Sequence, residues 1–365
     1  MKTWDAIIVG GGIIGLSLAL ELRRQRASVL VVDRTEPGRE ASWASAGMIA
    51  HCDPHLPVAL HPLADASASL YPDFVHEIQE ESQLHIDFRR EGTIWFGEAG
   101  ATPRKSTEQI ATEDHLAALE PRLAFRPGAW RLPECSIDTR RFLPALIKVA
   151  RIRDIDFVTG SPVVELELAA DRITGVRTEN ARYHSGTVVN CAGAWACQLG
   201  PLAVPTRPIK GHMLSVVFQH HTPGAKPLPE PVLSHVVRAP GVYIVPRSDG
   251  KLVIGSTVED AGFDKRVDPD IVQGLHQAAA ILVPDIGEAR MHEAWTGLRP
   301  GTPDGLPILG ATHIAGYFAA TGHYRDGIML APITARIMSD LLANSTPAFD
   351  LSPFSPERFA VPTAR

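Results

Sequence analysis

The sequence predicts a mixed α/β protein in which a Rossmann-like domain is interleaved with a domain built on an antiparallel sheet. Three observations lead to this fold class. The chain begins with a strand, a glycine-rich turn, a helix and a second strand. Segments of similar character return in the middle and near the end of the chain. Between them lie four apolar strands that are close together in the sequence, as in an antiparallel sheet.

The N-terminal segment has the order of elements that a dinucleotide-binding βαβ unit requires. In chain order, it contains a buried strand at residues 5–9, the turn Gly10-x-Gly12-x-x-Gly15, a helix at residues 13–26 and a strand at residues 28–32 that ends on Asp33. Because all of these parts agree, they are stronger evidence than the glycine pattern alone. The alternative is a βα unit that binds no nucleotide.

Each glycine of the turn has a separate task in such a unit. Gly10 permits the tight turn, Gly12 lets the backbone approach a pyrophosphate, and Gly15 lets the helix pack closely on the strand. The start of the helix offers free N–H groups to the phosphates. Asp33 can accept hydrogen bonds from ribose hydroxyls, which argues against a 2′-phosphate, although the neighbouring Arg34 weakens that point. The unit does not separate FAD from NAD, but its place at the N-terminus favours FAD.

The composition is that of an ordinary globular protein. Of the 365 residues, 45% are apolar and 21% are charged, and the net charge is −6 without a basic stripe. We therefore expect no nucleic-acid partner. The chain is long enough for two domains. It has no uninterrupted apolar stretch of membrane-spanning length, and the glycine-interrupted N-terminus is not that of a secretory signal, so we expect no membrane span.

Cysteine and histidine spacing gives no sign of a metal site. The four cysteines form no C-x-x-C pair, and we expect reduced thiols in a cytoplasmic protein. The 15 histidines show no helical spacing with a carboxylate, so we expect no bound metal.

The first half of the chain continues with a polar loop of small residues at 37–48, which would let the backbone lie against a planar or phosphate-bearing ligand. A plain surface loop is the alternative. After this loop we expect helices at residues 67–81, 106–119 and 138–152, and strands at residues 92–97, 161–168, 172–177 and 187–191.

The second half of the chain begins with the four strands at residues 209–218, 231–238, 242–246 and 251–258. A hairpin turn at Ser248-Asp249-Gly250 joins the last two. The remaining elements are a helix at residues 269–282, strands at residues 291–298 and 316–320, and a final helix at residues 328–342. From residue 349 onward the chain is Pro-rich, and we expect a weakly ordered tail.

These elements suggest a discontinuous division of the chain. We expect a cofactor-binding domain at residues 1–50, 140–205 and 290–345, a substrate-binding domain at residues 51–139 and 206–289, and a tail at residues 346–365. Interleaved domains of this kind place a ligand site at their interface.

Arg299 is the first candidate for a chemical role. It ends an expected strand, and Pro300 and Gly301 stiffen the turn that follows. Its planar, permanently charged guanidinium suits bidentate capture of a carboxylate. A surface ion pair to Asp304 is the alternative.

Arg325 and Tyr243 are the other two candidates. Arg325 lies just before the final helix, whose free N–H groups could stabilise negative charge on a reduced flavin ring; an ion pair with Asp326 is the alternative. Tyr243 lies on an expected strand and could bind a small substrate, unless it is a plain core tyrosine. The sequence contains no evident nucleophile triad or catalytic carboxylate pair, which fits chemistry performed by a redox cofactor.

Five stretches together resemble the D-amino-acid oxidase and sarcosine oxidase superfamily of FAD enzymes, and within it the glycine oxidase family of thiamine biosynthesis. They are Ile8-Val-Gly-Gly-Gly-Ile-Ile-Gly15, Ala44-Ser-Ala-Gly-Met48, Val242-Tyr-Ile-Val-Pro-Arg247, Leu298-Arg-Pro-Gly-Thr-Pro-Asp-Gly305 and Gly322-His-Tyr-Arg-Asp-Gly-Ile328. The resemblance covers nearly the whole chain. It is far more specific than the glycine pattern.

The resemblance implies noncovalent FAD and a set of site residues. Arg299 would match the arginine that holds the substrate carboxylate, Tyr243 the active-site tyrosine and Arg325 a second arginine beside the pocket. Besides the three glycines of the turn, the residues that would match FAD contacts are Ile13, Ile14, Asp33, Arg34, Ala41, Ser42, Ala46, Gly47, Met48, Val163, His323, Tyr324, Arg325, Asp326, Gly327, Ile328 and Met329.

Two departures from the family pattern bear on specificity, and a third concerns how the flavin is attached. Val258 stands where the family often has methionine, and Gly241 stands where a larger side chain is found. Both changes could enlarge the pocket and weaken a strict preference for glycine. The cysteine that binds flavin covalently in monomeric sarcosine oxidases has no counterpart, because no cysteine follows Cys197.

The activity that the resemblance implies is oxidative deamination of glycine and small amino acids. Hydride would pass to the flavin, water would hydrolyse the resulting imine to the α-keto acid (glyoxylate) and ammonia, and oxygen would reoxidise the flavin and give hydrogen peroxide. The family suggests a homo-oligomer in thiamine biosynthesis. The alternatives are a D-amino-acid dehydrogenase with another electron acceptor and a flavin-containing binding protein without turnover.

Overall fold

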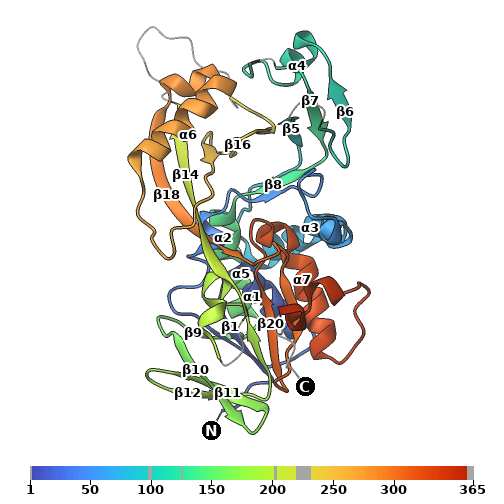
Figure 1. The fold of residues 1–365 in the computed structure, drawn as a ribbon, viewed down its shortest axis with the longest axis vertical. Coiled ribbons are helices and arrows are strands. Elements are labelled where there is room, and N and C mark those ends of the chain that lie inside the picture. The colour runs from blue at the N-terminus through green and yellow to red at the C-terminus, as the bar shows by residue number, and fades with distance from the viewer. Residues whose placement is uncertain (1, 98–100, 125, 201–203, 219–231, 360–365) are drawn as a thin grey trace.

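A computed structural model describes residues 2–97, 101–124, 126–200, 204–218 and 232–359. Two sheets dominate the architecture, a largely parallel one in the lower half of Figure 1 and a larger mixed one in the upper half, with helices and loops between them. No helix among the described residues is long and apolar enough to cross a membrane.

The lower sheet has six strands in the order β19-β20-β13-β1-β2-β9. Their bounds are β1 Ala6–Val9, β2 Val29–Val32, β9 Asp156–Val158, β13 Val188–Asn190, β19 Ile308–Ala311 and β20 Tyr317–Thr321. All neighbours run parallel except β19, which is antiparallel to β20. Every residue of β1 and β2 is buried, as expected for parallel strands covered on both faces.

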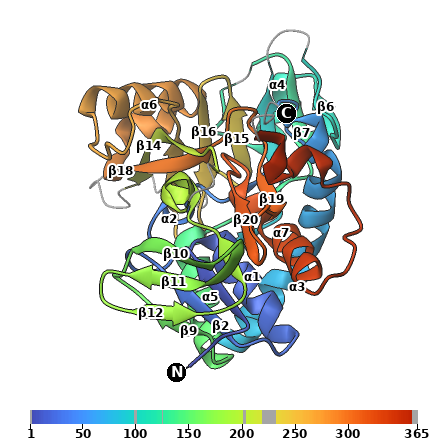
Figure 2. The ribbon, with the colours of Figure 1, turned by 60° about the horizontal axis from the view of Figure 1, so that its bottom comes forward.

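Side chains of this sheet alternate between two different cores. Ile8 and Val31 pack among the helices α1 Ile13–Arg24, α3 His61–Ser82, α5 Thr139–Ile152 and α7 Gly327–Leu342. Ile7 and Val9 face the other way, toward a three-stranded antiparallel sheet of β10 Val163–Ala169, β11 Arg172–Thr178 and β12 Arg182–His184. Figure 2 shows this small sheet beside β9 and β2. The lower half is therefore a three-layer arrangement.

The upper sheet has eight strands in the order β18-β14-β17-β16-β15-β5-β7-β6. Their bounds are β5 Thr93–Phe96, β6 Glu108–Ile110, β7 Ala129–Leu132, β14 Arg207–Val217, β15 Val236–Ala239, β16 Val242–Pro246, β17 Leu252–Gly255 and β18 Arg290–Gly301. Only β15 and β5 pair in parallel. The expected antiparallel sheet is thus confirmed in its main part, and strands from the first half of the chain extend it.

The two faces of the upper sheet have different neighbours. One face packs against the helix α6 Pro269–Leu282, whose Val272 and Leu275 meet Leu214 and Ile254. On the other face, Met213, Val245 and Trp295 pack against Ala44 and Ala46 of the loop after β2. This second face is the one that looks toward the nucleotide-binding half.

The remaining elements are shorter. They are α2 Ala41–Ala44, α4 Glu113–Leu119, a small sheet of β3 Met48–Ile49, β8 Cys135–Ile137 and β4 Phe88–Arg89, and short 3-10 turns at Val58–Leu60, Gly193–Gln198, Pro284–Glu288, Ser352–Phe354 and Pro356–Phe359.

The structure corrects the expected helix at residues 106–119. Its first part is the edge strand β6, which pairs with β7, and the helix α4 begins only at Glu113. The side chain of Thr112 accepts a hydrogen bond from the N–H of His115 and so fixes the helix start. Pairing with a distant strand prevails over local helix propensity here.

The expected weakly ordered tail is also wrong as far as residue 359. Phe354 is buried in the helical core, and the Arg358 guanidinium donates to the Asp304 carboxylate at 2.8 Å. Residues 360–365 of that tail and residue 231 of the expected strand 231–238 lie outside the described residues. The division into domains remains a prediction; β18, which the division groups with the cofactor-binding half, is an edge strand of the upper sheet, and α3, which it groups with the other half, packs against α7.

Candidate active site

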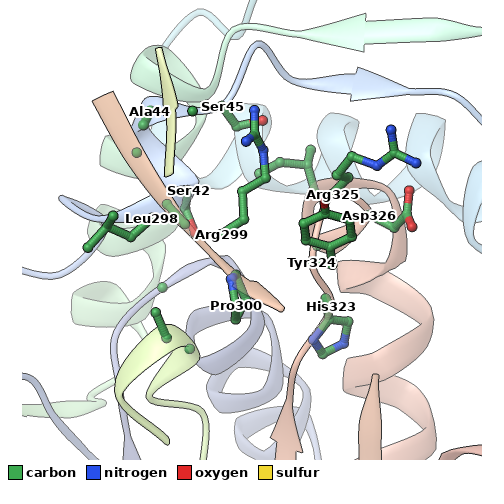
Figure 3. A pocket seen from close by; sticks show the side chains of 18 of the residues that line it. Ser42, Ala44, Ser45, Leu298, Arg299, Pro300, His323, Tyr324, Arg325 and Asp326 are labelled. Atoms are coloured by element: carbon green, nitrogen blue, oxygen red, sulfur yellow. The ribbon is translucent and has the colours of Figure 1, made fainter. Parts of the chain in front are cut away.

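A pocket of about 710 Å³ lies between the two halves of the molecule. On one side it is lined by the glycine turn and the end of β2, and on the other by the upper sheet, including Tyr243 and Arg299. Figure 3 shows Arg299 and Arg325 entering this region from different elements, with Tyr324 between them. The pocket thus joins the expected cofactor and substrate regions.

The glycine turn is close-packed against other backbone. Gly10 has a φ of 108°, and a Cβ atom there would lie 2.4 Å from the carbonyl oxygen of Cys191. A Cβ on Gly15 would lie 2.0 Å from the carbonyl oxygen of Gly10. Neither position has room for a side chain. Gly12 is the N-cap of α1 and makes no side-chain cap, but Oγ of Ser42 accepts the N–H of Ile13 at 3.0 Å, so the other N–H groups of the first turn are the ones left for an anion.

Asp33 is fixed at the end of β2. Its Oδ2 accepts the N–H of Gly11 at 2.7 Å, and its Oδ1 accepts the N–H of Thr35 at 2.8 Å. Oδ1 also accepts the Thr35 hydroxyl at 3.3 Å, so Oδ2 is the oxygen that keeps a further lone pair, on a residue that lines the pocket. The Arg34 guanidinium lies over the Trp195 ring, 4.5 Å from its centroid. The carboxylate is therefore oriented by backbone donors.

The loop of small residues is held by side chains from the upper sheet. Nη2 of the buried Arg247 donates to the carbonyl oxygen of Ala46 at 2.8 Å, and Nε1 of Trp295 donates to that of Ala44 at 3.0 Å. Burial lowers the pKa of Arg247. Gly47 has a φ of 74°, and a Cβ there would collide with the carbonyl oxygen of Ile137. This loop is therefore part of a packed wall, which disfavours the alternative of a plain surface loop.

The Arg299 guanidinium is oriented by neutral groups. Nη1 donates to the carbonyl oxygen of Thr257 at 3.0 Å, and Nη2 donates to Oγ of Ser256 at 2.7 Å. The side chain lies across Gly211, where a Cβ would be 2.3 Å from Nη1. Within the described part of the chain no carboxylate pairs with Arg299, and Asp304, its suggested partner, binds Arg358 instead. The guanidinium thus keeps N–H donors available in the pocket.

Tyr243 faces the same pocket from β16. Its hydroxyl lies 3.1 Å from the sulfur of Met213, and Gly255 on the neighbouring strand leaves room for both groups. A Cβ on Gly255 would lie 2.6 Å from the tyrosine oxygen. The missing side chain of Gly255 therefore sets the position of the phenol ring.

The turn before α7 supplies the third wall. Asp326 is the N-cap of α7 without a side-chain cap, so the first N–H groups of this helix are available. Desolvation raises the pKa of Asp326 to about 6. His323 is buried, its Nε2 lies 3.0 Å from Oγ1 of Thr334, and burial lowers its pKa to about 3, so it is neutral at pH 7. Arg325 is exposed, lies near the Tyr324 ring and makes no ion pair to a residue of the described ranges.

Sequence reasoning missed a buried charged cluster beside the pocket. Arg238 donates to Asp53 at 2.8 Å and to Glu134 at 2.9 Å, and both Arg238 and Asp53 line the pocket. Burial raises the pKa of Glu134, and it raises that of Cys52 to about 12, so this thiol stays protonated. The three charged residues are distant in the sequence and follow no motif.

The structure brings nearly all of the predicted site residues together. All of them line the pocket except Gly15, which packs on Gly10, and Met329, which is buried in the helical core with its carbonyl oxygen bound by Ser67. Gly241 and Val258 also line the pocket, and the space beside Gly241 is open. Among the described residues, no cluster of His, Cys, Asp and Glu could hold a metal ion.

These features fit a dinucleotide that carries a planar ring system. Backbone closely packed at Gly10 and Gly15, an open helix start at Gly12 and a fixed acid at Asp33 are what a pyrophosphate and a ribose require. A second open helix start at Asp326 lies in the same pocket, near Arg299.

Comparisons with known proteins agree with this geometry. The profile of the family described as "FAD dependent oxidoreductase", DAO, matches residues 5–341. The glycine oxidase of Geobacillus kaustophilus is 34% identical over 373 residues, which cover 96% of each chain. A crystal structure of glycine oxidase from Geobacillus kaustophilus superposes with a TM-score of 0.89 at 32% identity and covers 99% of this chain and 100% of that one.

A longer relative is also similar. The bifunctional protein ThiO/ThiG of Synechocystis sp. is 32% identical over 367 residues, which are 99% of this chain and 55% of that protein. This chain therefore spans about half the length of that curated relative.

Proposed function

The chain belongs to the DAO family of FAD-dependent oxidoreductases, and from that premise we propose that it oxidises glycine and related small amino acids. The products are the α-keto acid, which is glyoxylate for glycine, ammonia and hydrogen peroxide. The observation that carries the proposal is Arg299, whose guanidinium lies in the pocket with no paired carboxylate among the described residues. Similarity to glycine oxidases over nearly the full chain supports the substrate class.

The residues that would hold FAD are the predicted ones that line the pocket. The first turn of α1 would bind the pyrophosphate, Asp33 would bind a ribose, and the Ala46–Gly47–Met48 segment, which lines the pocket, would contact the flavin. FAD supplies the acceptor for the hydride that leaves the substrate. The N–H groups at the start of α7 stabilise negative charge at the ring.

The substrate is held through its carboxylate. One N–H of Nη1 binds Thr257 and one N–H of Nη2 binds Ser256. The remaining N–H donors of Arg299 bind the carboxylate. Tyr243 lines the same pocket as Arg299, where its hydroxyl would contact the bound amino acid. Together they fix the orientation of the α-carbon.

The positive charges of the pocket also prepare the amine. An amino acid must lose a proton from its ammonium group before the α-carbon can give up hydride. Arg299 and Arg325 both line the pocket, and nearby positive charge favours the neutral amine over the ammonium form. The buried, neutral His323 does not compete for that proton at pH 7.

Substrates slightly larger than glycine fit this pocket. Gly241 has open space where a Cβ would lie, and the short Val258 is largely exposed. We therefore expect sarcosine and small D-amino acids to react as well. We also propose that the protein is a cytoplasmic homo-oligomer that acts in thiamine biosynthesis; sedimentation analysis tests the assembly.

The test is turnover in air. Purified protein is mixed with glycine, sarcosine, D-alanine and D-proline, and keto acid and peroxide are measured with oxygen or an artificial dye as the electron acceptor. We expect glyoxylate and peroxide in equal amounts from glycine. Turnover with the dye alone would instead indicate a dehydrogenase.

A further inference from the structure

A chain of hydrogen bonds begins at the carbonyl oxygen that accepts from Arg299. The carbonyl oxygen of Thr257 accepts from Nη1 of Arg299 at 3.0 Å. The Thr257 side chain does not touch the guanidinium. Instead, its Oγ1 donates to the Glu259 carboxylate and accepts the N–H of His212 at 3.0 Å. Nδ1 of His212 also lies 3.3 Å from this oxygen. The hydroxyl is therefore used both as a donor and as an acceptor to hold the segment that orients Arg299.

Glu259 is itself fixed on two sides. Its backbone forms a β-bridge with Lys210 of β14. The N–H of each residue donates to the carbonyl oxygen of the other, and both N···O distances are 2.9 Å. Its Oε1 lies 2.8 Å from Nδ1 of His212. Burial acts to raise the pKa of Glu259, but hydrogen bonds from Thr257 and His212 outweigh it and lower that pKa, so the group is a carboxylate. The network thus ends on a charged acceptor tied to the sheet.

His212 is fully buried, and its neighbours determine its tautomer. The N–H of Asp268, the N-cap residue of α6, donates to Nε2 at 2.9 Å. Nε2 must therefore be an acceptor, and Nδ1 carries the hydrogen that is donated to Glu259. The imidazole links α6 to the segment that carries Ser256 and Thr257.

This arrangement favours binding of a carboxylate because it orients the Arg299 side chain in advance. A free arginine side chain populates many rotamers, and each must be given up when a small substrate binds. A guanidinium held in place beforehand loses less freedom on binding. On the sheet, Gly211 admits the Arg299 side chain, but only Ser256 and Thr257 bind its Nη atoms among the described residues.

We propose that Thr257, Glu259 and His212 form a positioning unit that holds the Arg299 fork toward the substrate carboxylate. The inference rests on the proposed function for the identity of the ligand, but not for the orientation of Arg299. None of the three residues touches the substrate; they act through the carbonyl oxygen of Thr257 and through the segment that carries Ser256.

A matched pair of variants isolates the hydroxyl. Thr257→Val keeps the shape of the side chain and removes Oγ1, which leaves Glu259 and the His212 N–H without this partner. Thr257→Ser keeps the hydroxyl. We expect KM for glycine to rise about 10- to 100-fold in Thr257→Val, with kcat changed by less than about threefold. Thr257→Ser should restore KM to within about threefold of the wild type.

Glu259→Gln tests the charge at the end of the network, and Asp260→Asn is its neighbouring control. The Asp260 carboxylate is exposed and pairs with Arg207. We expect a KM increase of about 10-fold for Glu259→Gln and no change for Asp260→Asn. The dissociation constant for FAD should be equal in all four variants, since a general structural defect would change it.

Crystal structures of Thr257→Val and Thr257→Ser separate this inference from the proposed function. We expect the Arg299 guanidinium in place in the serine variant and displaced in the valine variant, whatever the protein oxidises. An unmoved guanidinium or an unchanged KM in Thr257→Val would overturn the positioning unit. If the wild-type protein does not oxidise glycine, but Arg299 is displaced in Thr257→Val as expected, the proposed function alone would be overturned.

Discussion

The two sides of the pocket are built by different means. On the side of Gly10 and Asp33, the geometry comes from closely packed main-chain atoms of the glycine turn and of Cys191, which missing side chains allow to approach each other. On the side of Tyr243 and Arg299, the geometry comes from side chains on β16 and β18, held by groups on other strands and loops. The cofactor side depends on glycines, which have no side chain, and the substrate side depends on particular side chains.

Because of this difference, mutations on the two sides should have different effects on binding. Adding an atom to the glycine turn pushes backbone apart, whereas an atom added to Gly241 meets open space and is opposed only by the strain of a φ of 80°. Removing a side chain from the substrate side deletes a contact but leaves the sheet in place. We therefore expect complete loss of cofactor where an atom is added to the glycine turn, and graded loss of affinity where a single side-chain contact is removed.

The largest effect is expected from Gly15→Val. A Cβ at this position would lie 2.0 Å from the carbonyl oxygen of Gly10, so α1 must move away from β1. The variant should purify without flavin, as measured by the absorbance ratio of flavin to protein. Gly274→Ala is the control, because this helical glycine has open space around it; it should keep its flavin and gain about 0.4–1 kcal/mol of stability. A flavin-loaded Gly15→Val protein would contradict the account of the turn.

Arg299→Ala should have the largest effect on the other side. A charge-assisted bidentate contact contributes roughly 2–4 kcal/mol, so KM for glycine should rise about 30- to 1000-fold while flavin content stays unchanged. Steady-state kinetics measures this. An unchanged KM would remove Arg299 from the substrate site.

Asp33→Ala should weaken FAD binding without abolishing it. The variant loses the acceptor for the N–H groups of Gly11 and Thr35 together with the expected ribose contact. Loss of hydrogen bonds to a charged group costs roughly 1.5–3 kcal/mol, so the dissociation constant for FAD should rise about 10- to 150-fold. Quenching of flavin fluorescence reports it. Equal affinity in the variant would mean that Asp33 serves only the turn.

Tyr243→Phe should have the smallest effect. The ring keeps its place beside Gly255, and only the hydroxyl near the Met213 sulfur is lost. A neutral hydrogen bond contributes about 0.5–1.5 kcal/mol, so KM should rise roughly 2- to 10-fold. A larger rise would give the hydroxyl a stronger contact with the substrate than with Met213.

The contrast also explains what the sequence could predict. The first βαβ unit could be predicted from the sequence because its strand, turn and helix are consecutive and the spacing of the three glycines is typical of such a unit. The helix α6 has its expected bounds because Asp268 caps its start, Pro269 occupies its first turn, and apolar residues recur at helical spacing. In both cases the determining residues are neighbours in the chain.

Only part of the substrate side of the pocket could be predicted from the sequence. Arg299 was a candidate because prolines and a glycine follow it, but its partners lie 42 and 43 residues away. The parallel pairing of β15 with β5 and the Arg238–Asp53–Glu134 cluster join still more distant segments. The strand β6 was mistaken for helix for the same reason, since its partner β7 lies outside any local window.

The central claim is that this pocket holds FAD and also, at Arg299, the carboxylate of a small amino acid. The most direct test is the visible spectrum of the purified protein mixed with glycine in the absence of oxygen, for the wild type and for Arg299→Ala. We predict that glycine bleaches the flavin of the wild type and that the variant needs a far higher glycine concentration. A flavin that stays oxidised with glycine, sarcosine, D-alanine and D-proline, or equal bleaching of both proteins, would contradict the claim.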